Sequence, residues 1–218
     1  MRIVIVSDTH LRHDFALPDG DMLLHCGDGT LDGRAQQMKA FGEWLAAAPH
    51  RHKIVIAGNC ELTLERFRSF PKRYWPEAVY LQDSAVTIEG LKIYGSPWQP
   101  WFHDWAFNLP RGEPLARKWA MIPEDTDILV THGPPQGILD TVRGEETGLG
   151  CADLLKRVQR VQPALHAFGH IHSANGALVS GKTLFVNASI CDEEHKATQK
   201  PWLVDIGADG TVLGYRQP

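Results

Sequence analysis

Five short apolar runs, each followed closely by a residue able to bind a metal ion, constrain the fold of this chain more than any other feature. The runs are Ile3 to Val6, Met22 to His25, Lys53 to Ala57, Ile128 to Thr131 and Leu165 to Phe168. Short apolar runs bounded by turn residues are typical of buried strands. The sequence therefore predicts buried strands, with polar chemistry placed where each of them ends.

Segments with helical spacing lie between several of these runs. Apolar residues recur on one helical face within 38–48 and within 151–158. This alternation of strands and helices indicates an α/β fold. Three further segments, 85–94, 178–186 and 202–215, contain β-rich runs around turn residues and predict hairpins. The sequence shows no internal repeat, low-complexity tract or Ser/Gly linker, so we expect one domain over residues 1–218.

The composition limits which classes of binding partner and which cellular location we expect for the protein. The 26 acidic and 22 basic residues give a net charge of -4, which argues against a stable nucleic-acid complex and against an anionic membrane surface. The first apolar run is too short for a signal peptide or a membrane span, so we expect a cytoplasmic protein. The four cysteines form no Cys-x-x-Cys pair, which favours reduced thiols.

The residues that follow the five runs form a candidate metal site. They are Asp8, His10, Asp28, Asn59, His132, His170 and His172. In α/β sheets the carboxyl ends of the strands form the ligand site, so side chains placed there converge in space. Imidazole, carboxylate and amide donors together suit Mn, Fe or Zn better than Ca or Mg. Seven candidate ligands exceed the needs of one ion, which makes two ions reasonable.

Each motif taken alone also has an ordinary structural explanation. The segment that contains Asp8 and His10 could be a helix cap and a turn. Asp28 could belong to a glycine turn, and Asn59 to a turn dipeptide. The alternate histidines of Gly169-His170-Ile171-His172 can reach the same side of an extended segment, yet many such pairs are incidental. The occurrence of all these motifs at five successive strand ends favours the metal site.

The motifs SDTH, HCGD, GNCE, THGPP and GHIH, in this order, resemble the pattern of the calcineurin-like metallophosphoesterase superfamily. A closer similarity extends through VIAGNCELT, YLQDS, IYGSPWQPWF, FNLPRG, DILVTHGPP, LHAFGHIH and NASIC. These segments resemble the metallophosphoesterase-domain-containing subfamily over nearly the whole chain. The resemblance implies a four-layer α/β sandwich, in which two mixed β-sheets are flanked by α-helices.

The resemblance also implies a role for each candidate ligand. Asp8, His10 and His172 would hold one metal ion, Asn59, His132 and His170 would hold the other, and Asp28 would bridge them. The ions would be two divalent transition metals (Mn, Fe, Zn or Ni), with Mn favoured. The net charge of such a centre follows from simple arithmetic. Two ions contribute +4, two aspartates remove two charges and a bridging hydroxide removes one, which leaves about +1 facing the substrate.

This charge suits an anionic phosphoester, with the bridging hydroxide as nucleophile. We therefore expect a phosphodiesterase that acts on cyclic nucleotides or other small phosphodiesters, with Cys60, Asp28, Asn59 and His132 as its catalytic residues. A phosphomonoesterase or nucleotidase is the alternative within enzymes. A catalytically weak protein that binds metal and nucleotide is the alternative outside them. A nuclease is disfavoured because the sequence shows no basic stripe.

Cys60 is the one departure from the superfamily pattern. It stands where most members have the histidine of GNHE, which is taken to contact the phosphate and protonate the leaving oxygen. A thiol is a poor proton donor, and nearby cations would shift it toward thiolate. We therefore expect a preference for good leaving groups and for diesters over monoesters. The alternative is that Cys60 only fills space beside Glu61.

Two segments outside these motifs carry less definite signals. The segment Pro97 to Trp105 is rich in aromatic residues, which indicates packing under a loop or, less often, a face on which a nucleobase stacks. Arg111 and His103 lie near it and could contact a phosphate, although a salt bridge or simple exposure is the commoner outcome. His195 lies in the charged segment 192–200, which predicts a solvated loop without a role in the site.

Overall fold

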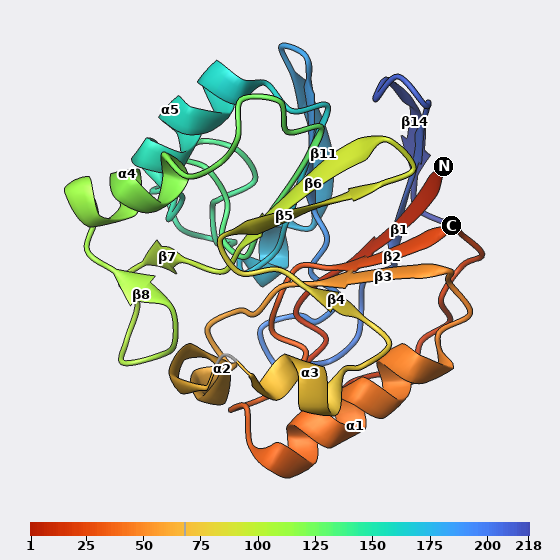
Figure 1. Ribbon diagram of the computed structural model, residues 1–218. Helices are drawn as coiled ribbons and strands as arrows, with labels where there is room; N and C mark the ends of the chain where they lie inside the picture. Colours follow the sequence, from red (N-terminus) through yellow and green to blue (C-terminus); the bar gives the residue numbers. More distant parts are fainter. Residues whose placement is uncertain (68) are drawn as a thin grey trace.

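The strands of the protein form two six-stranded sheets in a computed structural model that describes residues 1–67 and 69–218 (Figure 1). The first sheet has the order β14-β13-β1-β2-β3-β4. Its strands are β1 (Arg2–Val6), β2 (Met22–His25), β3 (His52–Val55), β4 (Val79–Tyr80), β13 (Trp202–Ile206) and β14 (Val212–Arg216). Strands β1 to β4 run parallel, and β13 pairs antiparallel with β1.

The second sheet has the order β11-β12-β10-β9-β6-β5. Its strands are β5 (Ser84–Ile88), β6 (Leu91–Ser96), β9 (Ile128–Thr131), β10 (Leu165–Phe168), β11 (Gly176–Ser180) and β12 (Thr183–Asn187). The four central strands are parallel, and the outer hairpins add antiparallel edges. A separate small pair, β7 (Gln99–Pro100) and β8 (Asn108–Leu109), lies in the aromatic segment and the residues that follow it.

Helices cover the outer face of each sheet, which gives four layers (Figure 1). The helices are α1 (Ala35–Ala47), α2 (Leu62–Arg66), α3 (Phe70–Tyr74), α4 (Glu113–Trp119), α5 (Ala152–Val161) and the short 3-10 helix η1 (His172–Ala174). Met38, Phe41 and Leu45 of α1 pack on the first sheet, as the helical spacing of 38–48 predicts. Helices α4 and α5 pack on the second sheet. Apolar residues of both sheets form the core between them.

The structure confirms the predicted fold and most element positions. All five apolar runs contain strands, although the third strand ends at Val55, two residues before the predicted end. Segments 38–48 and 151–158 lie largely in α1 and α5, and each predicted hairpin is present. All four cysteines are free. In the part of the chain that the structure describes, no helix has the length and hydrophobicity needed to cross a bilayer.

The carboxyl ends of the central strands come together from two sheets rather than from one. The Ser7 amide after β1 donates a hydrogen bond to the Ala188 carbonyl after β12 (2.9 Å), and the Ile190 amide donates to the Ser7 carbonyl (2.9 Å). These bonds join the ends of the two sheets at the edge where the candidate ligands follow their strands. The pattern of strands predicts that the candidate ligands converge at the edge of a sheet. In the structure the edges of two sheets are aligned, and the ligands converge there.

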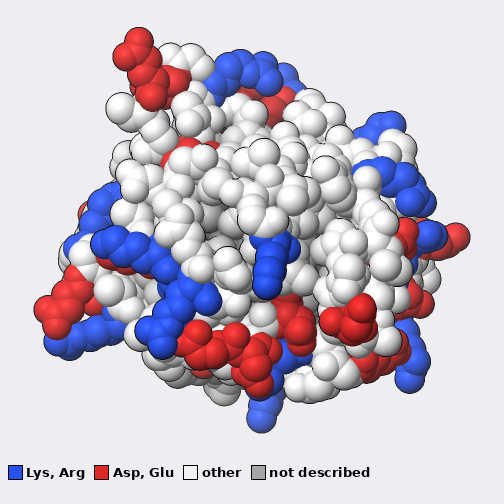
Figure 2. Space-filling model, turned by 90° about the horizontal axis from the view of Figure 1, so that it is seen from above, with Lys and Arg blue, Asp and Glu red and all other residues white. Residues whose placement is uncertain are grey.

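Charges of both signs are interspersed on the face of the molecule shown in Figure 2. Lysine and arginine side chains lie beside aspartate and glutamate around a largely uncharged centre (Figure 2). This pattern agrees with the modest net charge of -4. The cytoplasmic location and the lack of a stable nucleic-acid complex stay predictions.

His166 is a buried histidine that the second sheet holds in its neutral form. It lies in β10 with no exposed surface, and its Nε2 is 2.9 Å from the Thr131 hydroxyl oxygen. That hydroxyl donates to the Gly133 carbonyl (2.8 Å), so Nε2 is the donor toward Thr131. Its Nδ1 has no hydrogen-bond partner among the described residues. Burial lowers the pKa of His166 to about 3, because the imidazolium would be desolvated without compensation.

Because the pKa of His166 is lowered, we expect the protein to lose stability in acid. We expect a His166→Gln variant to lose less. The folded pKa lies below the unfolded one, so the contribution of His166 is fully present above about pH 6.5 and declines as the pH falls toward 3. Over that interval the free energy of unfolding of the wild type should fall by about 1.4 kcal/mol more per pH unit than that of the variant. Urea denaturation at several pH values between 6 and 4.5 measures both slopes. Parallel stability curves would contradict the prediction.

Candidate metal centre

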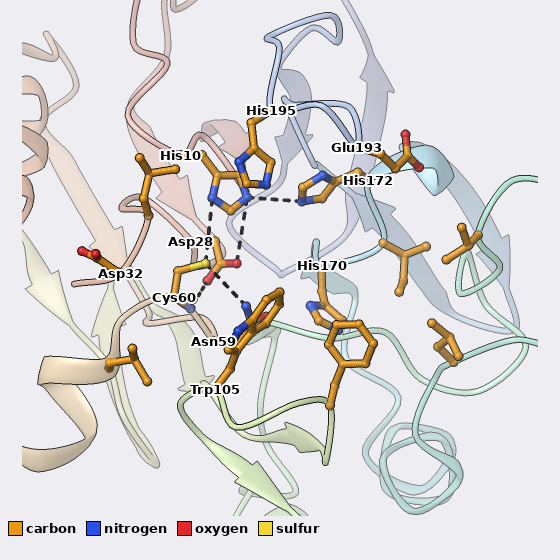
Figure 3. A pocket seen from close by; sticks show the side chains of 16 residues that line it. His10, Asp28, Asp32, Asn59, Cys60, Trp105, His170, His172, Glu193 and His195 are labelled. Carbon is orange, nitrogen blue, oxygen red and sulfur yellow. Dashed lines mark hydrogen bonds and ion pairs between the residues drawn. The ribbon is translucent and has the colours of Figure 1, made fainter.

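Loops that follow five strands bring the seven candidate ligands together, and Figure 3 shows those that line the cavity: His10, Asp28, Asn59, His170 and His172. Asp8 and His10 follow β1, Asp28 follows β2, Asn59 follows β3, His132 follows β9, and His170 and His172 follow β10. Contacts link these side chains to one another. The His10 and His172 Nε2 atoms are 3.3 Å apart, and the His172 Nε2 is 3.5 Å from Asp8 Oδ1. Asp28 Oδ2 lies 4.0 Å from the His10 Nε2 and 3.5 Å from the His132 Nε2.

The backbone at several of these residues is held in the left-handed conformation. Asp8, His10, Asp28 and His170 all have positive φ angles, of 51°, 44°, 54° and 69°. This region costs a residue other than glycine roughly 1 kcal/mol or more, and such strain is concentrated at functional sites. The sharp turns that result direct the side chains inward immediately after the strands end.

Two glycines in the motifs allow close approach to the ligands. A Cβ added at Gly169 would lie 2.0 Å from Asp8 Oδ2, and one at Gly58 would lie 2.2 Å from Asp28 Oδ1. Any side chain at either position would displace a candidate ligand. The glycines of the GN and GH dipeptides therefore leave space for the two carboxylates.

Hydrogen bonds to backbone carbonyls orient three of the imidazoles. The Nδ1 atoms of His10, His132 and His172 lie 3.3 Å, 3.0 Å and 2.9 Å from the carbonyl oxygens of Thr30, Cys26 and Asp192. A neutral imidazole that donates from Nδ1 carries its lone pair on Nε2. This arrangement is typical of histidines that bind metals through Nε2.

The Nε2 lone pairs would repel their neighbours without a cation between them. Those of His10 and His172 face each other at 3.3 Å. That of His132 faces two oxygen acceptors, Asn59 Oδ1 at 2.9 Å and Asp28 Oδ2 at 3.5 Å. Asp8 Oδ1 is buried and has no hydrogen-bond partner among the described residues. Two divalent ions, one in each group, would satisfy these atoms, so the donor set fits a dinuclear metal centre.

Protons can partly replace metal ions in this cluster. Burial lowers the pKa of His132, but Asp28 more than offsets this effect and raises the pKa to about 9. Burial also lowers the pKa of His172, but Asp8 more than offsets this effect and raises the pKa to about 9. Burial and the charge of His132 lower the pKa of His170 to about 4. The carboxylates thus strongly stabilise positive charge at the centre.

Comparison with known proteins agrees with this geometry. The family model described as calcineurin-like phosphoesterase matches residues 1–174. The chain belongs to the calcineurin-like phosphoesterase family. Members of this family use a dinuclear centre of divalent metal ions, and the described residues include candidate ligand groups for such a centre.

Animal proteins are similar to this chain over most of its length. Human metallophosphoesterase domain-containing protein 1 is 47% identical over 94% of this chain and 71% of its own length. The UPF0046 protein K07C11.7 of Caenorhabditis elegans is 38% identical over 92% of this chain and 73% of its own length.

Solved structures share the fold at low sequence identity. The protein TT1561 of Thermus thermophilus matches with a TM-score of 0.63 at 14% identity, over 99% of this chain and 98% of its own. A structure described as a novel archaeal phosphodiesterase matches with a TM-score of 0.54 at 16% identity, over 100% and 99% of the two chains.

Glu61 is the buried group that ties the loops of this phosphoesterase together. Its Oε2 accepts the amide hydrogens of Gly58 (2.6 Å) and Asp28 (3.0 Å). Its Oε1 accepts the amide hydrogen (2.9 Å) and the hydroxyl hydrogen (2.8 Å) of Thr30. Four donors on one carboxylate fix the loop after β2 against the loop after β3. The GNCE motif places Glu61 beside Cys60 but does not indicate this role.

Cys60 faces the cavity beside the candidate ligands (Figure 3). Its backbone amide donates to Asp28 Oδ1 (2.8 Å), and its Sγ is 3.5 Å from Asn59 Nδ2 and 4.0 Å from His10 Nδ1. Burial raises the pKa of the thiol, and the charges of Asp28 and Glu61 raise it further. The protein groups around Cys60 therefore favour a neutral thiol, whereas the expected cations would act in the opposite direction.

The aromatic segment divides between packing and the cavity. Trp98 packs against Phe107, and the Lys118 ammonium lies 4.2 Å from its ring centroid. Phe102 and Trp105 instead line the cavity above the candidate ligands. Arg111 donates to the carbonyls of Gly150 (2.7 Å) and Leu149 (2.8 Å), so it supports a loop of the cavity wall rather than the cavity itself. His103 is not among the residues that line the cavity.

His195 lines the cavity, contrary to the expectation of a solvated loop without a role. Its ring stacks on that of His10, with centroids 4.1 Å apart and an angle of 11° between the planes (Figure 3). Ser189 was also missed, and its hydroxyl donates to Asp8 Oδ2 (2.8 Å) beside the amide of His170 (2.9 Å). Neither residue follows one of the five apolar runs, so the pattern of those strand ends did not point to them.

A Glu61→Gln variant should weaken the whole centre although Glu61 is not a candidate ligand. The NH2 group of the glutamine would face N–H or O–H donors that one carboxylate oxygen now accepts. These donors would lose their acceptor, at a cost of about 1–3 kcal/mol for each buried group. We expect the free energy of unfolding to fall by about 2 kcal/mol or more, and metal content to fall as well. Urea denaturation and elemental analysis measure these changes. Glu65→Gln on the exposed face of α2 is the matched control, and equal behaviour of the two variants would contradict the prediction.

Proposed function

We propose that this protein is a phosphodiesterase that hydrolyses small phosphodiesters, cyclic nucleotides among them, at a centre of two divalent transition-metal ions, with Mn favoured. The observation that carries this proposal is the character of the cavity over the candidate ligands. The cavity has a volume of about 430 Å³ and is lined mainly by apolar and aromatic side chains beside the polar cluster. This size and lining are typical of sites for small organic molecules.

The walls of the cavity favour a phosphate with organic groups on more than one side. Leu31 and Leu62 line it from the segments that carry Asp28 and Cys60. The Phe102 ring lies 5.9 Å from that of His170, and Trp105 packs against Phe102. Val142, Leu149 and Ile171 complete the apolar lining. A diester carries two organic substituents that such walls can contact. The flat faces of Phe102 and Trp105 also suit a nucleobase, because every base has a π-face that stacks.

The charge of the cavity favours a monoanion. Among the described residues that line it, none is a lysine or an arginine, and the rim carries Asp32 and Glu193. A phosphomonoester is close to a dianion at neutral pH, and sites for such groups commonly supply Arg or Lys. A phosphodiester carries a single negative charge, which matches the small positive excess that remains after Asp8 and Asp28 neutralise part of the metal charge.

The ligand geometry supports a division of the cluster into two positions. Asp8, His10 and His172 lie together at one side, and Asn59 and His132 lie together at the other. His170 approaches the second group, with its ring centroid 5.0 Å from that of His132. Asp28 contacts a histidine of each group and is therefore the bridging candidate. When bound, the ions would supply an acidified water as nucleophile and positive charge for the phosphoryl oxygens.

The residues of the chain would serve this reaction by position and charge. Asp28 and Asp8 would reduce the positive charge of the centre until it balances the single negative charge of the substrate. The hydrogen bonds from His10, His132 and His172 to backbone carbonyls keep each Nε2 aimed at the cluster. The apolar walls exclude water from the substrate and strengthen the attraction between the centre and the phosphate.

The test of this proposal compares a chromogenic diester with its matching monoester. We expect metal-loaded protein to hydrolyse bis(4-nitrophenyl) phosphate with a kcat/KM at least tenfold above that for 4-nitrophenyl phosphate. We also expect 2′,3′- and 3′,5′-cyclic nucleotides to be cleaved. The assay scans Mn, Ni, Zn and Mg, and Asp28→Ala serves as the blank.

Each alternative has its own outcome in this assay. A preference for the monoester and for 5′-nucleotides would establish a phosphomonoesterase instead. Two bound metal ions and a bound nucleotide without turnover would establish a binding protein. Activity that persists undiminished in Asp28→Ala would exclude the candidate centre as the source of hydrolysis.

Cys60→His should change the dependence on the leaving group. An imidazole at this position can protonate a departing alkoxide, whereas the thiol is a poor donor. We expect cleavage of diesters with alkyl leaving groups to rise at least tenfold, and cleavage of activated aryl diesters to change little. The slope of log kcat/KM against the pKa of the leaving group measures this, with Cys60→Ser as the control of similar size. An unchanged slope in Cys60→His would contradict the donor role of this position.

A further inference from the structure

The loop 192–200 holds His195 over the candidate metal centre. The His195 amide donates to the Asp192 carbonyl (3.0 Å), and Asp192 Oδ1 accepts the amide hydrogens of Glu194 (3.1 Å) and Lys196 (2.9 Å). From the other side, the Arg12 Nε donates to the His195 carbonyl (3.0 Å). These bonds close a tight turn at the residue that lines the cavity. The position of the ring is therefore built into the fold.

The orientation of the His195 ring distinguishes it from the candidate ligands. Its plane is nearly parallel to that of His10, with an angle of 11° and centroids 4.1 Å apart. The lone pair of an imidazole nitrogen lies in the plane of its ring, so an ion in the plane of His10 lies well outside the plane of His195. A ring nitrogen of His195 lies within 4.8 Å of ligand atoms of His10 and His172. Because the ring is stacked on that of His10, its lone pair is not aimed at an ion that lies in the plane of His10. His195 is thus placed beside the centre, in an orientation that favours a contact to the substrate over a bond to the ion of His10.

Among the described lining residues no side chain is a cationic donor for an anionic group, and the neutral donors besides histidine are the Asn59 amide, the Trp105 indole and the Cys60 thiol. Four of its described lining residues are histidines, and His10, His170 and His172 are candidate ligands. His195 is the remaining one. No lysine or arginine is found among the described lining residues, and Cys60 offers only a weakly donating thiol. An N–H of a neutral imidazole is a better hydrogen-bond donor to a phosphoryl oxygen than a thiol is.

We propose that His195 is the substrate-contacting histidine of this site, with a ring N–H that donates a hydrogen bond to a phosphoryl oxygen of the bound substrate. In this role it supplies from the C-terminal loop the phosphate contact that Cys60 cannot provide. Its stack on His10 sets the ring at the edge of the candidate ligands and limits its rotation. This inference rests on the proposed function only in assigning a phosphoryl group as the ligand.

The test uses His195→Ala and His195→Phe in the full chain loaded with metal. Phenylalanine keeps an aromatic ring to stack on His10 but has no N–H. Inorganic phosphate is the binding probe, followed by titration calorimetry, and elemental analysis gives the metal content. We expect both variants to keep the metal content of the wild type, to bind phosphate at least tenfold more weakly, and to lose at least tenfold in kcat/KM for the aryl diester. His52→Ala, at the start of β3 and paired with Glu89, is the control.

Three outcomes would overturn the proposal. Loss of a metal equivalent in both variants would make His195 a ligand. Wild-type behaviour of His195→Phe together with a defect in His195→Ala would reduce its role to packing on His10. Unchanged phosphate affinity in both variants would exclude the contact. Phosphate binding does not require turnover, so a wild type that binds phosphate through His195 but cleaves no diester refutes the proposed function and leaves this inference standing.

Discussion

Lone pairs and carboxylates repel one another at the candidate centre, and the surrounding fold holds them together. Asp8 and Asp28 are buried within one small space, and the imidazoles of His10, His132 and His172 point their Nε2 atoms into it. Such a cluster is unfavourable unless a cation occupies it. The fold holds it together through strained turns, close glycines and the four bonds to Glu61. The free energy of folding that offsets this repulsion and strain comes from the apolar layers of the sandwich.

The architecture and the seven candidate ligands were predictable from the sequence because both follow local rules. Apolar runs form strands, and the parallel strands of a sandwich present their carboxyl ends at one edge. Residues placed immediately after those ends converge whatever the intervening chain does. The arrangement in two sheets was predicted from the family resemblance and is confirmed, whereas a pattern of strands alone does not show where one sheet stops and the next begins. The bonds between Ser7, Ala188 and Ile190 that align the two edges have no signal in the sequence.

The missed residues lie where local rules give no information. His195 stands in a charged segment without periodicity, and its contact with His10 spans 185 positions of the chain. Glu61 reads as an ordinary polar residue before a helix, although it is almost completely buried. Its role depends on the backbone amides of Gly58, Asp28 and Thr30, which only the folded chain brings together. The aromatic segment shows the same limit, since the pattern does not separate Trp98, which packs, from Trp105, which lines the cavity.

Reaction chemistry and substrate choice thus come from different parts of the chain. The candidate ligands are fixed by strand ends and rigid turns, which leave little freedom for change without loss of the centre. The walls come from loops and short elements: Leu31 and Leu62 on the first sheet side, and Phe102, Trp105, Val142 and Leu149 on the second. Loops tolerate substitution far better than strand ends do. In our proposal, a thiol at Cys60 with an imidazole at His195 would be one such rearrangement, in which the contact to the phosphate comes from the loop 192–200 while the candidate metal ligands stay in place.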